Sequence, residues 1–260
     1  MDVEHPPDLL SSPSPLRRVR LWFQAYVEAF GDILFPPRCA GCGRVGTILC
    51  DTCQAQFEPI VAPYCARCGQ PIEEGTLCTM CQSGRFRYLD VARSAAVFQS
   101  PLKEVIHDFK YRGNTRLAVP LAAYMSRRLR VEALHVDAFI PVPLHERRFR
   151  ERGYNQAALL ARHLGHVATI PVWEDVLVRV RHTPPQVTLG FRDRVKNMEG
   201  AFAVVDPAHV HGRTFLLIDD VMTSGSTLEA CAHALKDAGA KRVLGYTLAR
   251  APIHREDEVT

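Results

Sequence analysis

Residues 92–248 alternate between two hydrophobic patterns. Short apolar runs typical of strands lie at 92–98, 138–142, 202–205, 215–218 and 243–248. Between them, apolar residues recur at a spacing of about three to four, which predicts helices at 102–110, 117–134, 155–164 and 226–238. Strands that alternate with helices indicate an α/β domain, in which a mainly parallel sheet is flanked by helices on both faces.

A separate helical pattern precedes this region. Trp22, Tyr26 and Phe30 recur at helical spacing in the segment VRLWFQAYVEAFGDIL. The pattern predicts an amphipathic helix within residues 19–36, which ends at a pair of prolines. We expect this helix to pack on its own protein, and a helix lying on a membrane surface is the alternative. Residues 1–18, rich in Pro and Ser, are expected to be a disordered lead.

The composition is typical of a soluble globular protein, with 47% apolar and 23% charged residues among 260. This length suffices for one large domain and a small one. The net charge is only +4, but basic residues gather at 147–152 and 179–196. Such clusters suit an anionic ligand and permit nucleic acid without requiring it. There is neither an apolar run of about 18 residues nor a recognisable secretory signal, so we expect no membrane span and a cytoplasmic location.

Eight of the nine cysteines form four Cys-x-x-Cys pairs. The pairs are Cys39/Cys42, Cys50/Cys53, Cys65/Cys68 and Cys78/Cys81. Each pair places two thiols on one tight turn, and zinc takes four such ligands in a tetrahedron, so the segment predicts two closed structural Zn²⁺ sites. The first and third pairs continue into glycine (CAGCG and CARCG), a duplication that favours pairing in sequence order, although interleaved pairing also fits the gaps. Disulfides, iron–sulfur ligation and redox cysteines are the alternatives.

The ninth cysteine, Cys231, lies apart from the others. It shares a predicted helix face with Leu228 and Leu235. A free cysteine in such a position usually behaves as a small apolar side chain. We therefore expect a buried, unreactive thiol.

The stretch FLLIDDVMTSGSTL joins an apolar strand, two carboxylates and a hydroxyl-rich loop. We expect Asp219 and Asp220 at the C-terminal end of the strand, on the edge where open α/β sheets bind ligands. The loop offers N–H and hydroxyl donors at a helix N-terminus, which suits a phosphate; it consists of Thr223, Ser224, Gly225, Ser226 and Thr227. The two acids can accept hydrogen bonds from neighbouring ribose hydroxyls. The combination predicts a ribose 5-phosphate site, and the alternatives for the acids are Mg²⁺ coordination alone or helix capping.

This segment resembles the signature with which type I phosphoribosyltransferases bind phosphoribosyl pyrophosphate (PRPP). Further blocks are similar to those of the ComF (GntX-like) family and follow in the same order: FPPRCAGCG at 35–43, FKYRG at 109–113, IPVPLHERRFRERGYNQA at 140–157, and RHTPPQ to NMEGAF at 181–202. The likeness extends over about residues 20–250. One departure is Val187 with Thr188, where the family pattern has a small or hydroxyl residue and often glycine.

The resemblance implies a type I phosphoribosyltransferase-like fold preceded by a small double zinc ribbon. The expected segments are a lead, a helix, a zinc module, the phosphoribosyltransferase-type domain and a tail, at 1–18, 19–36, 37–88, 89–250 and 251–260. By the same resemblance, Asp219 and Asp220 hold the ribose hydroxyls and form the catalytic pair, while the 223–227 loop holds the 5-phosphate. The loop after the strand ending at Pro141 to Pro143 faces the pyrophosphate, and a hood at about 181–200 covers the site.

PRPP loses pyrophosphate through a cation-like transition state, so such a site also needs Mg²⁺ and cations beside the leaving group. The candidate cations are Arg147, Arg148, Arg152, Arg192, Arg194 and Lys196, and a solvated surface charge is the alternative for each. Lys110 and Arg112 receive less weight. Two functions follow. One is transfer of phosphoribosyl from PRPP to an unidentified acceptor, linked through the family to competence and DNA uptake. The other is non-catalytic PRPP sensing, or binding of single-stranded DNA or a protein of the DNA-uptake machinery.

Overall fold

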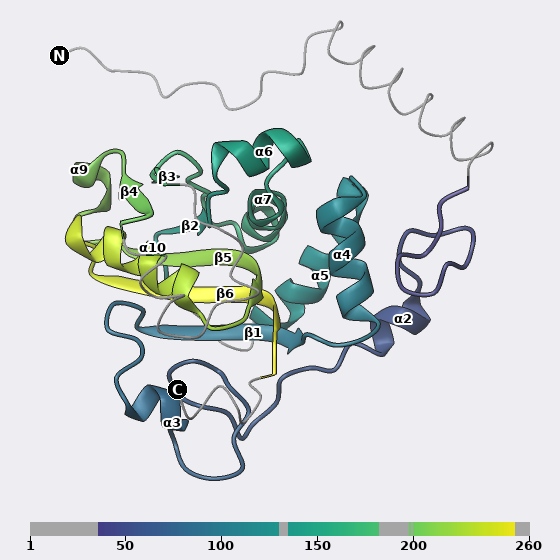
Figure 1. Cartoon of the computed structure of the whole chain (residues 1–260), viewed down its shortest axis with the longest axis horizontal. Helices are drawn as coiled ribbons and strands as arrows, with labels where there is room; N and C mark the ends of the chain where they lie inside the picture. The colour runs from purple at the N-terminus through teal and green to yellow at the C-terminus, as the bar shows by residue number, and fades with distance from the viewer. Residues whose placement is uncertain (1–35, 130–134, 182–197, 199, 253–260) are drawn as a thin grey trace, which may run out of the picture.

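The computed structural model describes residues 36–129, 135–181, 198 and 200–252. Four strands form one sheet in the order β1–β6–β5–β2 (Figure 1). These strands are β1 (Val91–Val97), β6 (Arg242–Arg250), β5 (Thr214–Met222) and β2 (Ala138–Pro141). Every pairing between them is parallel. The parallel sheet predicted from the strand–helix alternation is therefore confirmed.

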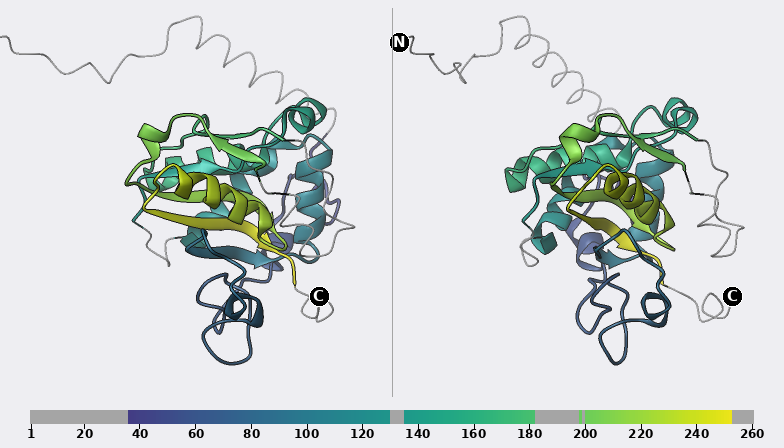
Figure 2. Two further views of the ribbon diagram at one scale, coloured as in Figure 1. Left: turned by 60° about the vertical axis from the view of Figure 1, so that its left-hand side comes forward. Right: turned by 90° about the vertical axis from the view of Figure 1, so that its left-hand side faces the viewer.

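Helices cover both faces of this sheet (Figures 1 and 2). Successive side chains of a strand point to opposite faces, and β5 divides its apolar residues accordingly. Leu216 and Ile218 pack into a cluster with α5 (Ala118–Leu129) and α7 (Gln156–Ala168). Phe215 and Leu217 pack into a second cluster with α10 (Ser226–Asp237). All four of these β5 side chains are fully buried, so β5 is the centre of the core.

The helix α4 (Leu102–Tyr111) is placed differently from the covering helices. It follows β1 and stands across the edge at which the strands end, rather than along a face of the sheet (Figure 1). A short 3-10 turn, Thr115–Leu117, leads from α4 into α5. The C-terminal end of α4 therefore reaches the edge where open α/β sheets bind ligands.

The two cysteine modules pack on different parts of the core. The first contains α2 (Asp51–Ala55), and its Phe57 meets Tyr124 of α5 edge to face, with ring centroids 5.3 Å apart. The second contains α3 (Thr79–Gln82) and lies beyond the β1 edge of the sheet (Figures 1 and 2). Cysteines of the first module belong to the α5 cluster and those of the second to the α10 cluster.

Several elements differ from the sequence prediction. The 202–205 strand exists as β4 (Phe202–Val204), but it pairs antiparallel with β3 (Leu177–Arg179) in a separate two-stranded sheet. A strand as short as β3 gives too few positions for a two-residue period to be recognised. Among the described residues, four short helices are not predicted by the periodicity. Two lie in the cysteine segment, α2 and α3, and two lie outside it, α6 (Glu146–Arg152) and α9 (Pro207–Val210).

The predicted β5 strand is too short by four residues at its C-terminal end. It was expected at 215–218 and runs to Met222, so the acid pair lies inside the strand instead of following it. The apolar residues Val221 and Met222 continue the strand after the two acids. The expected lead, the 19–36 helix and nearly all of the 181–200 hood lie outside the described residues. Within the described ranges, no helix has the length and apolar character needed to cross a membrane.

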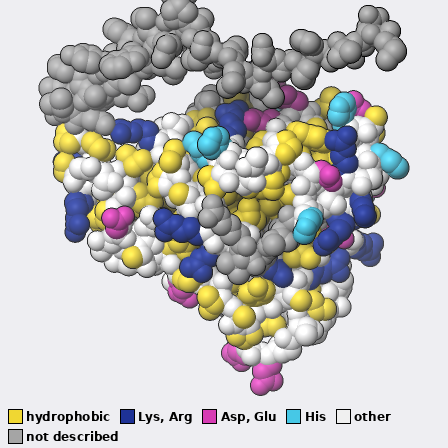
Figure 3. Space-filling model, turned by 180° about the vertical axis from the view of Figure 1, so that it is seen from behind, with side chains coloured by type: hydrophobic (Ala, Val, Ile, Leu, Met, Phe, Trp, Pro, Cys, Tyr) yellow, Lys and Arg dark blue, Asp and Glu magenta, His cyan; other side chains and the backbone are white. Residues whose placement is uncertain are grey.

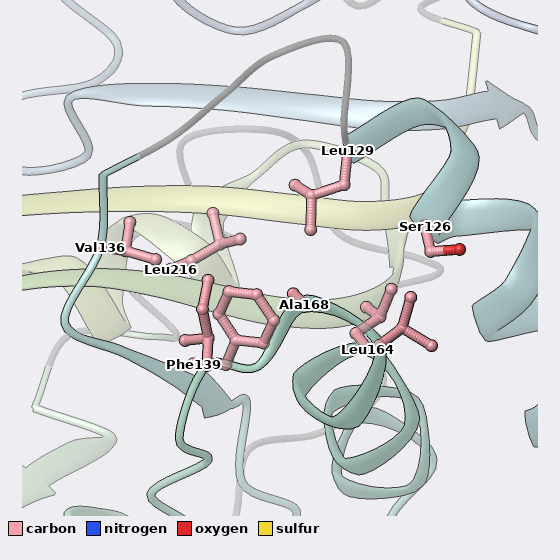
Figure 4. A pocket seen from close by; sticks show the side chains of 9 residues that line it. Ser126, Leu129, Val136, Phe139, Leu164, Ala168 and Leu216 are labelled. Carbon is pink, nitrogen blue, oxygen red and sulfur yellow. The ribbon is translucent and has the colours of Figure 1, made fainter.

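An apolar pocket of about 280 Å³ lies where β2 and β5 begin (Figure 4). Phe139, Leu164 and Leu216 point into it, and Ser126 is its one hydroxyl-bearing residue. The other lining residues are Leu129, Val136, Val167, Ala168 and Ile170. A pocket with no charged side chain is unsuited to a phosphate, and it lies at the opposite end of the strands from the acid pair.

Candidate functional site

The first four cysteines converge on one point. The Sγ atoms of Cys39, Cys42, Cys50 and Cys53 all lie within 4.8 Å of one another. Two of the sulfur–sulfur distances are 3.7 Å (Cys39 to Cys50) and 3.8 Å (Cys42 to Cys50). A tetrahedral zinc with Zn–S bonds of about 2.3 Å separates its sulfurs by roughly 3.8 Å. The residues therefore fit a zinc ion without rearrangement.

The remaining four form a matching group. The Sγ atoms of Cys65, Cys68, Cys78 and Cys81 also lie within 4.8 Å of one another, and Cys68 and Cys78 are 3.7 Å apart. Pairing in sequence order is thus the arrangement found, and interleaved pairing is not. The pairs form no disulfides.

The turns of the cysteine pairs use glycine as expected. Gly43 and Gly69, which follow the first and third pairs, have φ of 74° and 71°, the left-handed region that favours glycine. Within the first group, backbone N–H groups of Cys50 and Cys53 point at sulfur. Burial raises the pKa of Cys39, but backbone hydrogen bonds from Cys50, Cys42 and Gly41 lower it to about 6. The thiolate form needed for metal binding is therefore favoured at this cysteine.

The acid pair lies at the other candidate site. Because β5 continues through Met222, Asp219 and Asp220 point to opposite faces of the sheet. Asp220 is only 7% exposed, and its Oδ1 lies 2.7 Å from Nζ of Lys110 at the end of α4. Lys110 thus supplies the countercharge that a buried carboxylate requires.

Asp219 is half-buried on the α10 side of the sheet, and no described residue forms an ion pair with it. Burial raises its pKa most, the charge of Asp220 raises it further, and Lys110 and Arg179 offset part of the rise, so the pKa is about 7 instead of 3.8. Two neighbouring carboxylates therefore sit in different electrostatic environments. A pKa near the working pH is a property often found at functional sites.

The hydroxyl loop follows at the same edge. Ser224 and Ser226 are buried, and their hydroxyls are 2.9 Å apart. Gly225 has φ of 79°, and no side chain caps the α10 helix that begins after it. A Cβ at Gly225 would lie 2.6 Å from Met222 Cε and 2.8 Å from the ring of Phe86, so only glycine fits there. The N–H of Ser226, the first residue of α10, contacts the Ser224 hydroxyl at 3.3 Å, so hydroxyl and amide donors lie together at a helix N-terminus, where an anion is favoured.

A basic pocket of about 660 Å³ lies on the α4 side of the acid pair. It is lined by Lys110, Tyr111, Gly113, Arg147, Arg148, Glu151 and Arg152. Arg147 pairs with Glu151 at 3.0 Å, and the Arg152 guanidinium lies over the Tyr111 ring. Among the described residues, Arg148 has no hydrogen-bond or ion-pair partner, so it is the least compensated cation of the pocket. Seen from behind the view of Figure 1, Lys and Arg side chains lie at both sides of the molecule and acidic side chains at its lower tip (Figure 3).

The structure brings together most, but not all, of the predicted residues. The acid pair, the 223–227 loop and three of the candidate arginines lie at one edge, whereas Arg192, Arg194 and Lys196 lie outside the described residues. Lys110 is more important than the sequence analysis indicates, because it contacts Asp220 and also lies beside the arginines of the basic pocket. Its position in the FKYRG block is the sequence feature that points to it. Arg112 pairs instead with Asp108 at 3.3 Å. Cys231 is fully buried, as expected, and burial raises its pKa well above 9.0.

Comparison with known families agrees with these two sites. The family model of the double zinc ribbon domain matches residues 30–82, and that of the phosphoribosyl transferase domain matches residues 150–260. Fold, cysteine groups and family matches together define a protein that joins a double zinc ribbon to a phosphoribosyltransferase-type α/β domain.

Curated relatives give the family. Competence protein F of Haemophilus influenzae is 33% identical over 210 residues, which cover 78% of this chain and 90% of that protein. DNA utilization protein YhgH of Escherichia coli (strain K12) is 32% identical, with 72% and 83% covered. Competence protein ComFC of Bacillus subtilis is 28% identical, with 78% and 84% covered. The chain belongs to the ComF family of competence and DNA-utilization proteins.

The cysteine groups predict the metal content of the protein. Elemental analysis of the purified full chain should find about two zinc ions. Cys42→Ser in the first group and Cys81→Ser in the second should each reduce the content to about one, because each removes one ligand from a closed site. Cys231→Ser is the control and should retain both ions. A folded, metal-free preparation of the unmodified chain would contradict the assignment.

The raised pKa of Asp219 predicts a pH dependence of stability. Because the folded state holds this proton more tightly than the unfolded state, the contribution is present below about pH 4 and is lost as the pH rises through about 7. The free energy of unfolding should therefore fall by on the order of 2 kcal/mol between pH 5 and pH 8 through this group. Asp219→Asn should flatten that fall in urea unfolding, whereas Asp175→Asn, at an exposed position outside the helices and strands, should not. An unchanged profile in Asp219→Asn would refute the prediction.

Proposed function

We propose that the chain binds PRPP at the carboxyl edge of the sheet and transfers its phosphoribosyl group to an acceptor. One observation carries the proposal. Lys110 contacts Asp220 and also lines the basic pocket, so the acids suited to ribose hydroxyls and the cations suited to pyrophosphate form one continuous site. PRPP carries both groups in one molecule: ribose hydroxyls, which donate to carboxylates, and a pyrophosphate, which requires cations.

The 5-phosphate end of PRPP is assigned to the 223–227 loop. The loop combines the Ser224 and Ser226 hydroxyls with the N-terminus of a 12-residue helix, α10, whose N-cap residue is Gly225. The N-terminus of a helix carries partial positive charge and unpaired N–H groups, both of which favour a phosphate. Asp219 and Asp220 lie four to five residues before Ser224, so the acids and the loop follow one another at the C-terminal end of β5.

The pyrophosphate end is assigned to the basic pocket. Arg148 is the strongest candidate, because no described residue neutralises it, while Arg147 already pairs with Glu151. Planar guanidinium groups can give two parallel hydrogen bonds to a phosphate. Lys110 would then have two possible anionic partners, Asp220 and the pyrophosphate.

The chemistry follows from this placement. The C1–O bond of PRPP breaks with its electron pair passing to pyrophosphate, and the acceptor forms the new bond at C1. Positive charge that develops on the ribosyl group is stabilised by the carboxylates of Asp219 and Asp220. Mg²⁺ bound together with PRPP would supply further charge neutralisation on the leaving group. The basic pocket holds the departing pyrophosphate, so the cations act where negative charge accumulates.

PRPP binding tests this proposal. PRPP with Mg²⁺ should raise the melting temperature of the full chain. Arg148→Gln should weaken PRPP affinity about tenfold, because one charge-assisted contact is worth roughly 1.5 kcal/mol or more. Arg150→Gln is the matched control, since Arg150 is on the same helix, pairs with Glu146 and does not line the pocket. Calorimetric titration of PRPP measures both.

The acid pair gives the decisive result. Replacing Asp219 and Asp220 together by Asn should abolish measurable PRPP binding while α10 and the sheet remain folded. Unchanged PRPP affinity in that variant would overturn the proposal. Release of pyrophosphate from PRPP in the presence of Mg²⁺ and a panel of nucleobases and amines then separates an enzyme from a PRPP sensor.

A second candidate function is binding of single-stranded DNA. Two aromatic side chains are exposed beside the basic pocket, Tyr111 (63% exposed) and Phe149 (48% exposed). Basic grooves with aromatic side chains bind single strands by phosphate contacts and base stacking. The names of the relatives, which refer to competence and DNA utilization, point in the same direction.

This function predicts a distinct salt dependence. Affinity for a single-stranded oligonucleotide should fall steeply between low and physiological salt, because bound phosphates release counterions. Tyr111→Ala should weaken binding about tenfold, since stacking of a base is worth roughly 1–3 kcal/mol. Val119→Ala, at an exposed position on α5, is the control. Binding that is indifferent to both salt and Tyr111→Ala would rule this surface out.

A further inference from the structure

Arg250 is a buried arginine at the end of β6, and only 2% of it is exposed. Its guanidinium group makes four polar contacts in two directions. Nε donates to Oε1 of Gln70 at 2.6 Å, and Nη1 donates to the carbonyl of Cys68 at 2.9 Å. Nη1 also reaches Sδ of Met222 at 3.0 Å, and Nη2 lies 3.5 Å from Sγ of Cys68.

These contacts join the second cysteine group to the strand that carries the acids. Cys68 is one of the four cysteines of that group, and Met222 is the last residue of β5. The neighbouring residue Ala251 donates its N–H to the carbonyl of Met222 at 3.0 Å. Met222 in turn lies against Gly225, where an added Cβ would come within 2.6 Å of its Cε. A continuous path of contacts therefore runs from the metal ligand Cys68 to the hydroxyl loop.

Two further contacts tie the same module to the loop. The ring of Phe86, five residues after Cys81, also lies against Gly225, 2.8 Å from the position that a Cβ would take. The carboxylate of Glu229, in the first turn of α10, accepts the backbone N–H groups of residues 87, 88 and 89 at 2.6, 3.0 and 3.0 Å. The chain leaving the second cysteine group is thereby fixed to the helix whose N-terminus forms the loop.

The charge of Arg250 also depends on this module. A buried guanidinium group is costly unless a negative charge compensates it. No carboxylate of the described residues forms an ion pair with Arg250, whose Nη2 lies 3.5 Å from the sulfur of Cys68, a sulfur that zinc would hold as a thiolate. A zinc ion with four thiolates carries a net charge of about −2, so the filled second site supplies the compensation. The first cysteine group belongs to the other hydrophobic cluster, beside Tyr124.

We propose that Arg250 is a positioning residue that ties the 223–227 loop to the second zinc site. Zinc in that site fixes Cys68, Cys68 fixes Arg250, and Arg250 holds Met222 against Gly225. The 5-phosphate affinity of the loop therefore depends on the second zinc site and on Arg250, and not on the first zinc site. The inference rests on the proposed function for the identity of the ligand, but the coupling itself is a property of the protein alone.

The test uses the full chain with zinc content measured in every sample. Arg250→Gln is compared with Arg250→Lys, which retains the charge, and with the control Arg242→Gln at the exposed start of the same strand. Hydrogen exchange reports the loop directly: the amides of residues 223–227 should exchange at least about tenfold faster in Arg250→Gln, with Arg250→Lys intermediate and the control unchanged. Zinc content should remain near that of the unmodified chain.

Ligand affinity is the second measurement. Affinity for ribose 5-phosphate should fall about tenfold in Arg250→Gln, while affinity for inorganic pyrophosphate, which belongs to the basic pocket, should stay within about twofold. Equal loss for both ligands would indicate general destabilisation and overturn the inference. If Arg250→Gln does not fold, Cys81→Ser is compared with Cys42→Ser, and only the former should accelerate loop exchange and weaken ribose 5-phosphate binding.

The outcomes separate the two proposals. Unchanged loop exchange in a folded Arg250→Gln overturns the coupling, whatever the ligand results are. If the unmodified chain binds neither PRPP nor ribose 5-phosphate, the proposed function fails, and the exchange data alone then decide for or against the coupling.

Discussion

A pair of consecutive carboxylates inside the central strand is the constraint on which the site depends. Neither can leave the core, because β5 continues past them and is anchored by Met222. One cation therefore has to be brought to them from elsewhere, and α4 does this by standing across the strand ends and presenting Lys110. The same placement opens the basic pocket beside the acids, since Lys110 and Tyr111 form one wall of it. Lys110 is thus both the countercharge of a buried acid and a lining residue of an anion pocket.

The two acids also lie in different environments. Asp220 faces Lys110, whereas Asp219 faces the α10 side with a pKa of about 7. A strand places neighbouring side chains on opposite faces, so this separation is built into the backbone. Because its pKa is about 7, Asp219 is partly protonated at neutral pH.

Much of this arrangement was predictable from the sequence, and the failures have physical reasons. Periodicity located the parallel strands and the covering helices, because burial on a sheet face imposes it, and the duplicated CxxCG turns indicated the order of the cysteine pairing. The extent of β5 was misjudged because two charged residues look like a strand end, although Val221 and Met222 resume the apolar pattern. The roles of Lys110 and Arg250 depend on contacts with residues about 110 and 180 positions away, which no local pattern contains.

The packing of the cysteine modules has a consequence for the integrity of the molecule. One module completes the hydrophobic cluster on the α5 face, and the other completes the cluster on the α10 face. Both hydrophobic clusters of the α/β domain thus include residues from segments that precede it in the chain. Removing residues 36–88 would expose apolar residues of both clusters. The zinc-ribbon segment and the phosphoribosyltransferase-type portion therefore share their hydrophobic packing.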